Sequence, residues 1–311
     1  MNSFEHKNPQ IHQKNPWNSI FFLVLLFVAC NLVGQLIGTG LALAFSGINF
    51  LEIEQVMKPP FTAESKRFLY WAQGVSHFLG FTVFGLLFIK FFDHQKIKSY
   101  FHFNSLSISG AALVVLMTIS FMLFNSIVIE WNMNVEFPEF MKGFEVWARN
   151  MEDQLLEVTQ ALSSYANLSE MLVAMLVIGI LPAIGEELIF RGLLQNKLLV
   201  VSKNAHLAIW VTAIIFGAFH MQFFGVVPRI LLGALFGYIY YYSGNIWYPV
   251  IAHFINNGLA VFVMYIGPRY IEDWNPQEID SSVPPTMSLV ALLICGGLFY
   301  QFIKSMKSEE V

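Results

Sequence analysis

Long stretches without a charged side chain are the feature that most constrains the fold of this chain. Only 12% of its 311 residues are Asp, Glu, Lys or Arg, against roughly 25% in soluble domains. Hydrophobic residues make up 56% of the chain. The charged side chains are too few to cover the surface of a water-soluble protein of this size. We therefore expect a membrane protein. The uncharged stretches are residues 15–51, 68–89, 99–129, 204–228, 230–268 and 281–303.

These stretches predict membrane-spanning helices, because a helix needs about 20 mostly apolar residues to cross a bilayer. The stretch 230–268 is long enough for two helices, with a turn at Ser243-Gly244-Asn245. Since every backbone polar group inside lipid must be bonded internally, the predicted fold is an all-α, polytopic membrane bundle of about eight transmembrane helices. We expect these helices at 17–45, 68–92, 107–129, 169–197, 206–222, 228–242, 246–266 and 286–304.

The distribution of basic residues between loops predicts the orientation of the bundle. Residues 130–168 hold seven acidic side chains against Lys142 and Arg149, and residues 267–285 are also acidic, with Glu272, Asp273, Glu278 and Asp280. The prediction is an integral membrane protein with both termini in the cytoplasm. The net charge of −4 excludes nucleic acid as a partner. The predicted cytoplasmic cations are Lys7, Lys14, Lys90, Lys96, Lys98, Lys197, Lys203, Lys304 and Lys307.

The acidic loop 130–168 has a pattern of its own. Its apolar residues recur at steps of three and four, which predicts an amphipathic helix. Two interpretations remain open: a gate or lid over the bundle, or a helix that rests in the membrane interface, which we favour. The apolar residues are Phe137, Phe140, Phe144, Trp147, Met151 and Leu155.

Three charged residues lie within the fourth predicted helix, where charge is costly unless it is paired or hydrated. Glu187 and Arg191 are four residues apart and share a helix face, so they are expected to pair. Glu186 points about 100° away from Glu187. No neighbour in the sequence pairs with Glu186, so it is the carboxylate expected to bind water or to titrate.

Two histidines are expected at the same depth as Glu186. His220 lies within the fifth predicted helix, and His253 shares a face of the seventh with Asn257. Counting residues from the predicted turns places Glu186, His220 and His253 about 15 Å from the cytoplasmic side. A carboxylate with two imidazoles suits the activation of water for attack on a carbonyl group.

Two mechanisms remain open for these four side chains. In one, Glu186 takes the proton of water while His253 and Asn257 donate hydrogen bonds to the developing oxyanion and His220 holds the water. In the other, Glu186, His220 and His253 bind a catalytic zinc ion. The first reading needs no cofactor. The HExxH pattern of helical zinc proteases is absent from the sequence.

At these residues the chain resembles the CAAX-protease and bacteriocin-processing family of intramembrane proteases, which includes the type II CAAX prenyl endopeptidases. The motifs are Glu186-Glu187-x-x-x-Arg191, Phe216-x-x-x-His220 and His253-x-x-x-Asn257. The resemblance implies that Glu186, His220, His253 and Asn257 are catalytic and that Glu187 and Arg191 are accessory. Its similarity to bacterial members implies the bacterial cytoplasmic membrane.

The resemblance also divides the chain. Residues 168–266 are the expected protease core, preceded by residues 1–167 with three helices and the acidic loop, and followed by residues 267–311. The implied activity is that of an endopeptidase acting on membrane-associated proteins or peptides within the lipid bilayer. A proton-coupled transporter and a non-catalytic immunity or scaffold protein are the alternatives, because buried carboxylates and imidazoles also form proton relays.

Overall fold

Helices form all the regular structure of the described residues, which are 15–97, 106–275 and 283–308 of this computed structural model. Seven helices are long and apolar enough to cross a membrane, and an eighth apolar helix, α12, is shorter. The predicted all-α membrane bundle is confirmed. The long helices are α2 (Pro16–Ser46), α4 to α5 (Ala63–Phe91), α7 (Ile108–Met133), α9 to α11 (Leu168–Ser202), η7 to α13 (Phe223–Ser243), α14 (Trp247–Tyr270) and α15 (Pro285–Ser308), and α12 is Ala205–Phe219.

Polar residues before the apolar runs set where the helices begin. Asn15, Thr62, Ser107, Asn167 and Asn204 each accept a hydrogen bond from a backbone N–H in the first turn of the helix that follows. The predicted turn between α13 and α14 is also present. There, α13 ends at Ser243 and Gly244 adopts a positive φ of 62°, a conformation that costs glycine little.

Two of the long helices contain π-helical segments, which give them a different local pitch. The helix of α4 (Ala63–His77) continues through η2 (Phe78–Val83) into α5 (Phe84–Phe91). The helix of α9 (Leu168–Ala174) continues through η5 (Met175–Ile180), α10 (Leu181–Glu187) and η6 (Leu188–Gln195) into α11 (Asn196–Ser202). Such segments are frequent at functional sites.

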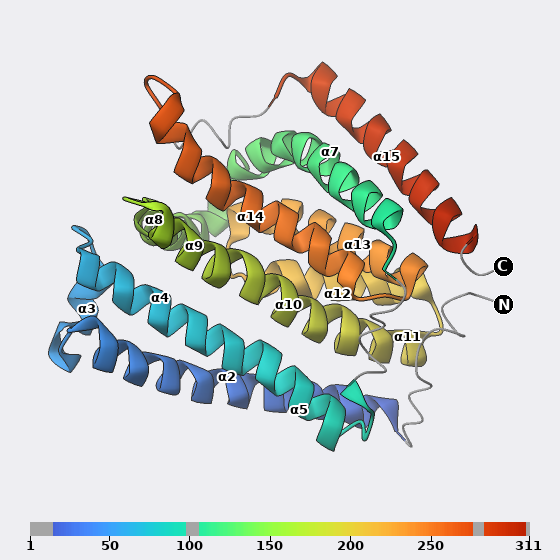
Figure 1. Ribbon diagram of the computed structural model, residues 1–311, viewed down its shortest axis with the longest axis horizontal. Helices are drawn as coiled ribbons and strands as arrows, with labels where there is room; N and C mark the ends of the chain where they lie inside the picture. Colours follow the sequence, from blue (N-terminus) through green and yellow to red (C-terminus); the bar gives the residue numbers. More distant parts are fainter. Residues whose placement is uncertain (1–14, 98–105, 276–282, 309–311) are drawn as a thin grey trace.

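The α9–α11 helix is the centre of the bundle (Figure 1). On one side α4 and η2 contact it and α2 packs along α4; on the other side it contacts α14, and α7 packs against α14 and α15. The start of α2 and the end of α15 lie at the same end of the bundle (Figure 1). Residues 186–197 of the central helix are all buried, so Glu186, Glu187, Arg191 and Lys197 lie inside the protein.

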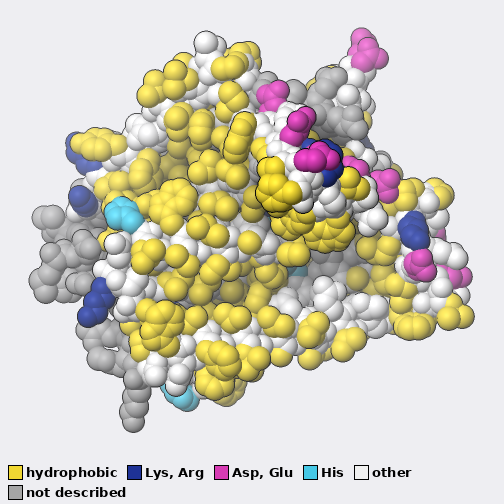
Figure 2. Space-filling model, turned by 180° about the vertical axis from the view of Figure 1, so that it is seen from behind, with side chains coloured by type: hydrophobic (Ala, Val, Ile, Leu, Met, Phe, Trp, Pro, Cys, Tyr) yellow, Lys and Arg dark blue, Asp and Glu magenta, His cyan; other side chains and the backbone are white. Residues whose placement is uncertain are grey.

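Charges segregate between the two ends of the bundle. On the face shown in Figure 2, Asp and Glu lie toward one end, where some Lys and Arg also lie, and the other end carries Lys and Arg without acidic side chains. The orientation of these ends in a membrane stays a prediction. Lys7, Lys14, Lys98, Glu278 and Asp280 lie outside the described residues.

The position of Lys197 differs from the prediction. It was expected in a loop, but the central helix continues to Ser202, and the Lys197 side chain is fully buried. Its Nζ lies 2.8 Å from both carboxylate oxygens of Asp93, which follows α5. Lys197 therefore reports an internal ion pair and not a water-exposed loop.

The acidic loop contains the predicted amphipathic helix, α8 (Lys142–Leu162). Phe144 and Trp147 pack against Phe223, with ring centroids 4.9 and 5.8 Å apart. Phe140 was expected on the same buried stripe, but it lies in the short η4 turn (Glu139–Met141) before the helix and is 86% exposed. Thus α8 covers the turn between α12 and α13.

Candidate active site

The buried charges of the central helix form the candidate site. Glu186 and Glu187 end α10, and Arg191 lies one turn on in η6. Their exposed fractions are 7%, 0% and 0%, so none of the three charges is hydrated by bulk solvent. Such charges are tolerated only when they are paired inside the protein.

Glu187 is the acceptor that joins two helices. Its Oε1 accepts a hydrogen bond from Arg191 Nη1 at 2.9 Å, which confirms the predicted ion pair. The same oxygen lies 2.8 Å from Nδ1 of His253 on α14. Because a carboxylate oxygen accepts, Nδ1 of His253 carries the hydrogen. Glu187 thus fixes the orientation of the His253 ring. This contact between two helices was not predicted from the sequence.

The Gly233-x-x-x-Gly237 spacing of α13 allows the close approach that seats Arg191. Arg191 Nη2 donates to the Gly233 carbonyl oxygen at 2.9 Å, and Gln195 Nε2 donates to that of Gly237 at 3.1 Å. A Cβ on Gly233 would lie 3.0 Å from the Phe216 ring, which itself packs 4.7 Å from the guanidinium. Small residues therefore let α13 supply acceptors to the buried side chains.

Glu186 lies between two imidazoles. Its Oε1 is 3.2 Å from Nε2 of His77, the last residue of α4, and its Oε2 is 3.9 Å from Nε2 of His253. Oε2 has no hydrogen-bond partner among the described residues. The partner of Glu186 was missed because it lies 109 residues earlier in the chain. An imidazole inside an uncharged predicted span was the available signal.

His220 directly follows α12, which ends at Phe219, three residues before the expected 222. Its Nδ1 is 2.9 Å from the Phe216 carbonyl oxygen, so Nδ1 is the protonated nitrogen and Nε2 is the acceptor of the neutral ring. His220 interacts electrostatically with both Glu186 and His253. His220 therefore lies in the same part of the bundle as Glu186 and His253, whose Oε2 and Nε2 atoms are 3.9 Å apart.

Asn257 has a structural partner. Its Nδ2 donates to the carbonyl oxygen of Ile178 at 3.0 Å. The residue four positions after Ile178 is Pro182, which has no N–H for the usual helical bond. Asn257 thus replaces a missing backbone donor inside the bundle and retains a second amide hydrogen.

The fit of a metal ion can be tested on these side chains. Among the residues that the structure describes, no group of three or more His, Cys, Asp and Glu side chains is arranged to hold a metal ion. Glu186, His220 and His253 therefore do not fit the zinc site that the second reading requires.

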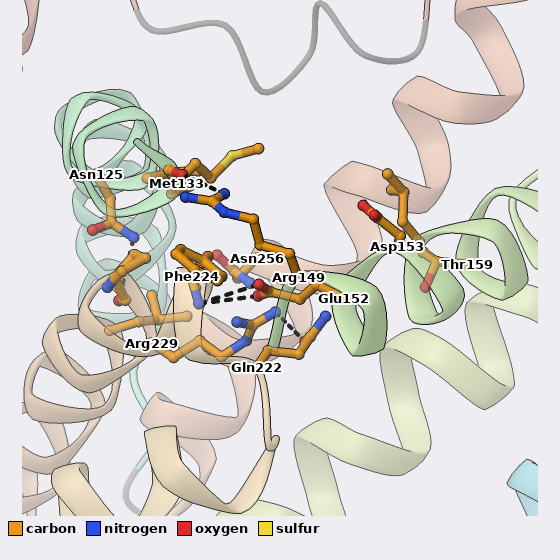
Figure 3. Close-up of a pocket in the computed structure, with 15 residues that line it drawn as sticks. Asn125, Met133, Arg149, Glu152, Asp153, Thr159, Gln222, Phe224, Arg229 and Asn256 are labelled. Carbon is orange, nitrogen blue, oxygen red and sulfur yellow. Dashed lines mark hydrogen bonds between the residues drawn. The ribbon is translucent and has the colours of Figure 1, made fainter. Parts of the chain in front are cut away.

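A cavity of about 520 Å³ is lined by Asn256, the neighbour of Asn257 in the sequence (Figure 3). Its walls come from α7, α8, the η7 turn (Phe223–Gly225), α13 and α14. Asn256 lines the cavity and donates from Nδ2 to Asn257 Oδ1 at 3.0 Å, which links cavity and site. The size is that of a pocket for a small molecule or a short peptide segment.

One carboxylate holds α8 against this cavity. Glu152 accepts hydrogen bonds from the Phe224 N–H at 3.1 and 3.3 Å (Figure 3). Burial raises the pKa of Glu152, and the Phe224 N–H partly offsets that rise. Glu145, at the start of α8, accepts from Lys142 and Arg149, and the Lys142 hydrogen bond lowers its pKa. Glu152 therefore joins α8 to the η7 turn, whereas the ion pairs of Glu145 lie within α8, from which Arg149 also donates to the Met133 and Val135 carbonyl oxygens.

Comparison with known proteins agrees with the resemblance read from the motifs. Residues 168–259 match the family model described as type II CAAX prenyl endopeptidase Rce1-like. The chain is 29% identical over 107 residues to the uncharacterized protein YpbD of Bacillus subtilis (strain 168), an alignment of 33% of this chain and 51% of YpbD. The chain thus spans about half the length of that relative. No solved structure matches. The three motifs lie inside the matched segment, and His77 lies outside it.

Proposed function

We propose that this chain is an intramembrane endopeptidase in which Glu186 activates water to hydrolyse a peptide bond of a membrane-associated protein or peptide. The observation that carries the proposal is the buried carboxylate of Glu186 with an unpartnered Oε2 directed toward His253. A buried carboxylate acceptor beside imidazoles is the arrangement that general-base hydrolysis needs. The match to a family of type II CAAX prenyl endopeptidases supports the same reaction class.

The proposed steps use side chains whose positions are described above. Glu186 Oε2 takes a proton from water, and the hydroxide oxygen bonds to the carbonyl carbon of the substrate. When the carbon–nitrogen bond breaks, the proton on Glu186 passes to the leaving amine nitrogen. His220 Nε2, an acceptor in the neutral ring, helps to hold the water.

His253 and Asn257 are the proposed oxyanion donors. His253 Nδ1 already donates to Glu187, so a second donation from Nε2 requires the doubly protonated ring. Asn257 contributes the amide hydrogen that does not bond Ile178. Donors in a dry site stabilise an oxyanion strongly.

The cavity beside Asn256 is the proposed route by which a peptide reaches Glu186. It has both apolar walls and polar side chains, and α8 lies along it. We propose the cytoplasmic membrane as the location, with both termini in the cytoplasm. The core 168–266 supplies the residues of the three motifs in this proposal.

The test is comparative membrane proteomics of cells that produce wild type or Glu186→Ala. We expect peptides with new termini in the wild-type membranes and the intact precursors in the variant. Equal cleavage by purified wild-type and Glu186→Ala protein would refute hydrolysis by Glu186. Loss of proton flux in proteoliposomes with Glu186→Gln, without any change in cleavage, would favour the transporter, and a phenotype that survives changes at Glu186, His220 and His253 would favour a scaffold.

A further inference from the structure

His77 carries an inference that rests on the proposed function and extends it. We propose that His77 is a positioning residue for Glu186, so that the α2–α4 helix pair completes an active site whose motifs all lie in residues 168–259. His77 Nε2 lies 3.2 Å from Glu186 Oε1, and the two side chains are 14% and 9% exposed. Because the carboxylate accepts, Nε2 is the donor, and this bond leaves Oε2 facing His253.

The His77 ring is held in a fixed plane. It stacks on Phe81, with ring centroids 4.2 Å apart and ring planes within 2° of parallel. Phe81 is 3% exposed and packs edge-on against Phe27 of α2 and Phe219 of α12. A side chain packed this way loses little further freedom when it donates a hydrogen bond, so it can hold the carboxylate in one orientation.

Glycine at position 185 lets α4 and η2 approach the central helix closely enough for this contact. A Cβ at Gly185 would lie 2.8 Å from Phe81 Cβ and 3.1 Å from His77 Cε1. Contacts this short require the helices to move apart. The residue directly before Glu186 is therefore matched in size to the segment that carries His77.

The surroundings of this contact are polar and buried. His77 Nδ1, Thr82 Oγ1 and Glu186 Oε2 have no hydrogen-bond partner among the described residues. The first two lie close to Gly185, since the added Cβ would also be 3.0 Å from Thr82 Oγ1. Buried polar atoms are nearly always bonded in native proteins, so these atoms are suited to water or the peptide group of a substrate. If His77 served only to fill space, polar atoms would not be required at this position.

If His77 orients Glu186, its loss should affect the rate of the reaction and not the binding of substrate. If His77 Nε2–H fixes Oε1, then loss of the donor lets the carboxylate rotate away from the attacking water. We expect kcat to fall by about 10- to 100-fold, the range of misplaced catalytic groups, while KM stays within about twofold. His77→Phe removes the donor and keeps a flat ring for the stack on Phe81. His77→Gln keeps an N–H donor.

The experiment uses the full chain, purified in detergent, and a peptide substrate defined by the proteomic comparison of wild type with Glu186→Ala. His206→Phe is the matched control, because His206 Nδ1 bonds the Tyr238 hydroxyl at 2.7 Å on an exposed surface away from Glu186. We expect low kcat with normal KM and a normal melting temperature for His77→Phe, substantial rescue in His77→Gln, and wild-type kinetics for His206→Phe.

Each other outcome is decisive. Wild-type kcat in His77→Phe, with Glu186→Ala inactive, overturns the role of His77 and leaves the proposed function standing. Equal losses in His77→Phe and His77→Gln with a lowered melting temperature would assign His77 to packing and overturn the inference. Identical membrane peptides from wild type and Glu186→Ala overturn both proposals.

Discussion

Replacing Glu187 with glutamine tests the electrostatic logic of the site. Glu187→Gln has nearly the same shape, but it removes the only carboxylate within hydrogen-bond distance of Arg191 in the described residues. The guanidinium stays fully buried, with the Gly233 carbonyl oxygen at 2.9 Å and the rings of Phe216 and Phe236 at 4.7 and 5.4 Å. A carbonyl and two aromatic faces do not neutralise a buried cation.

The expected magnitude follows from that burial. Both side chains of the pair are 0% exposed, so screening by water does not reduce the loss. Breaking a buried pair by removing one partner costs about 3–5 kcal/mol, because the other charge is left uncompensated. Glutamine retains a carbonyl oxygen for Arg191 and for His253 Nδ1, so we expect the lower half of that range, about 3–4 kcal/mol.

The assay is the free energy of unfolding, measured by titration with a denaturing detergent in mixed micelles. In Glu187→Gln/Arg191→Met both charges are gone, so this double variant should be more stable than Glu187→Gln alone. The matched control is Glu54→Gln, which breaks an exposed pair with Lys58 at 2.7 Å and should cause no measurable change. A loss in Glu187→Gln no larger than that of the control would refute the reasoning.

Three further perturbations probe the packing, the hydrogen bonding and the pH dependence of the same elements. Gly185→Ala should destabilise the fold by about 1–3 kcal/mol through overpacking against Phe81, and it should lower the cleavage rate. The control is Gly40→Ala, whose Cβ would meet nothing within 4 Å. In the same unfolding and cleavage assays, Gly40→Ala should change neither the stability nor the rate. Asn257→Ala leaves the Ile178 carbonyl oxygen without its donor and should cost about 1–3 kcal/mol of unfolding free energy, whereas a stability equal to wild type would assign Asn257 to catalysis alone. The pKa of Glu145 lies below its ordinary 4.5 because of the Lys142 hydrogen bond, so its contribution to the stability of the first turns of α8 is complete above pH 4.5 and is lost as pH falls through the lowered value. Hydrogen exchange in α8, corrected for the intrinsic rate, should therefore increase at the acidic end in wild type and be insensitive to this step in Glu145→Gln.

The sequence predicted the elements whose determinants are local. Uncharged runs and their polar caps define the helices, and the step between Glu187 and Arg191 is a property of one helix, so both were predicted correctly. The turn at Gly244 was also predicted, since glycine there precedes a new apolar run. These features depend on residues within a few positions of one another.

The features that were missed depend on distant residues. Nothing near Glu186 indicates His77, because the contact requires the packing of α4 against the central helix at Gly185. Lys197 was assigned to the loop after the fourth predicted helix, and its partner Asp93, which follows α5, is distant in the sequence. The π-helical segments shift side-chain directions away from the regular 3.6-residue repeat on which face assignments depend.

The ion pair of Lys197 with Asp93 has a consequence for dissecting the gene. A polypeptide of residues 168–259 alone would contain Lys197 without Asp93 and Glu186 without His77. Such a fragment exposes a lysine and a glutamate whose bonding partners, Asp93 and His77, lie outside it. We therefore expect the fragment to misassemble alone and to recover when residues 1–167 are co-expressed as a separate polypeptide. The stretch that is shared with relatives is shorter than the stretch that must assemble together.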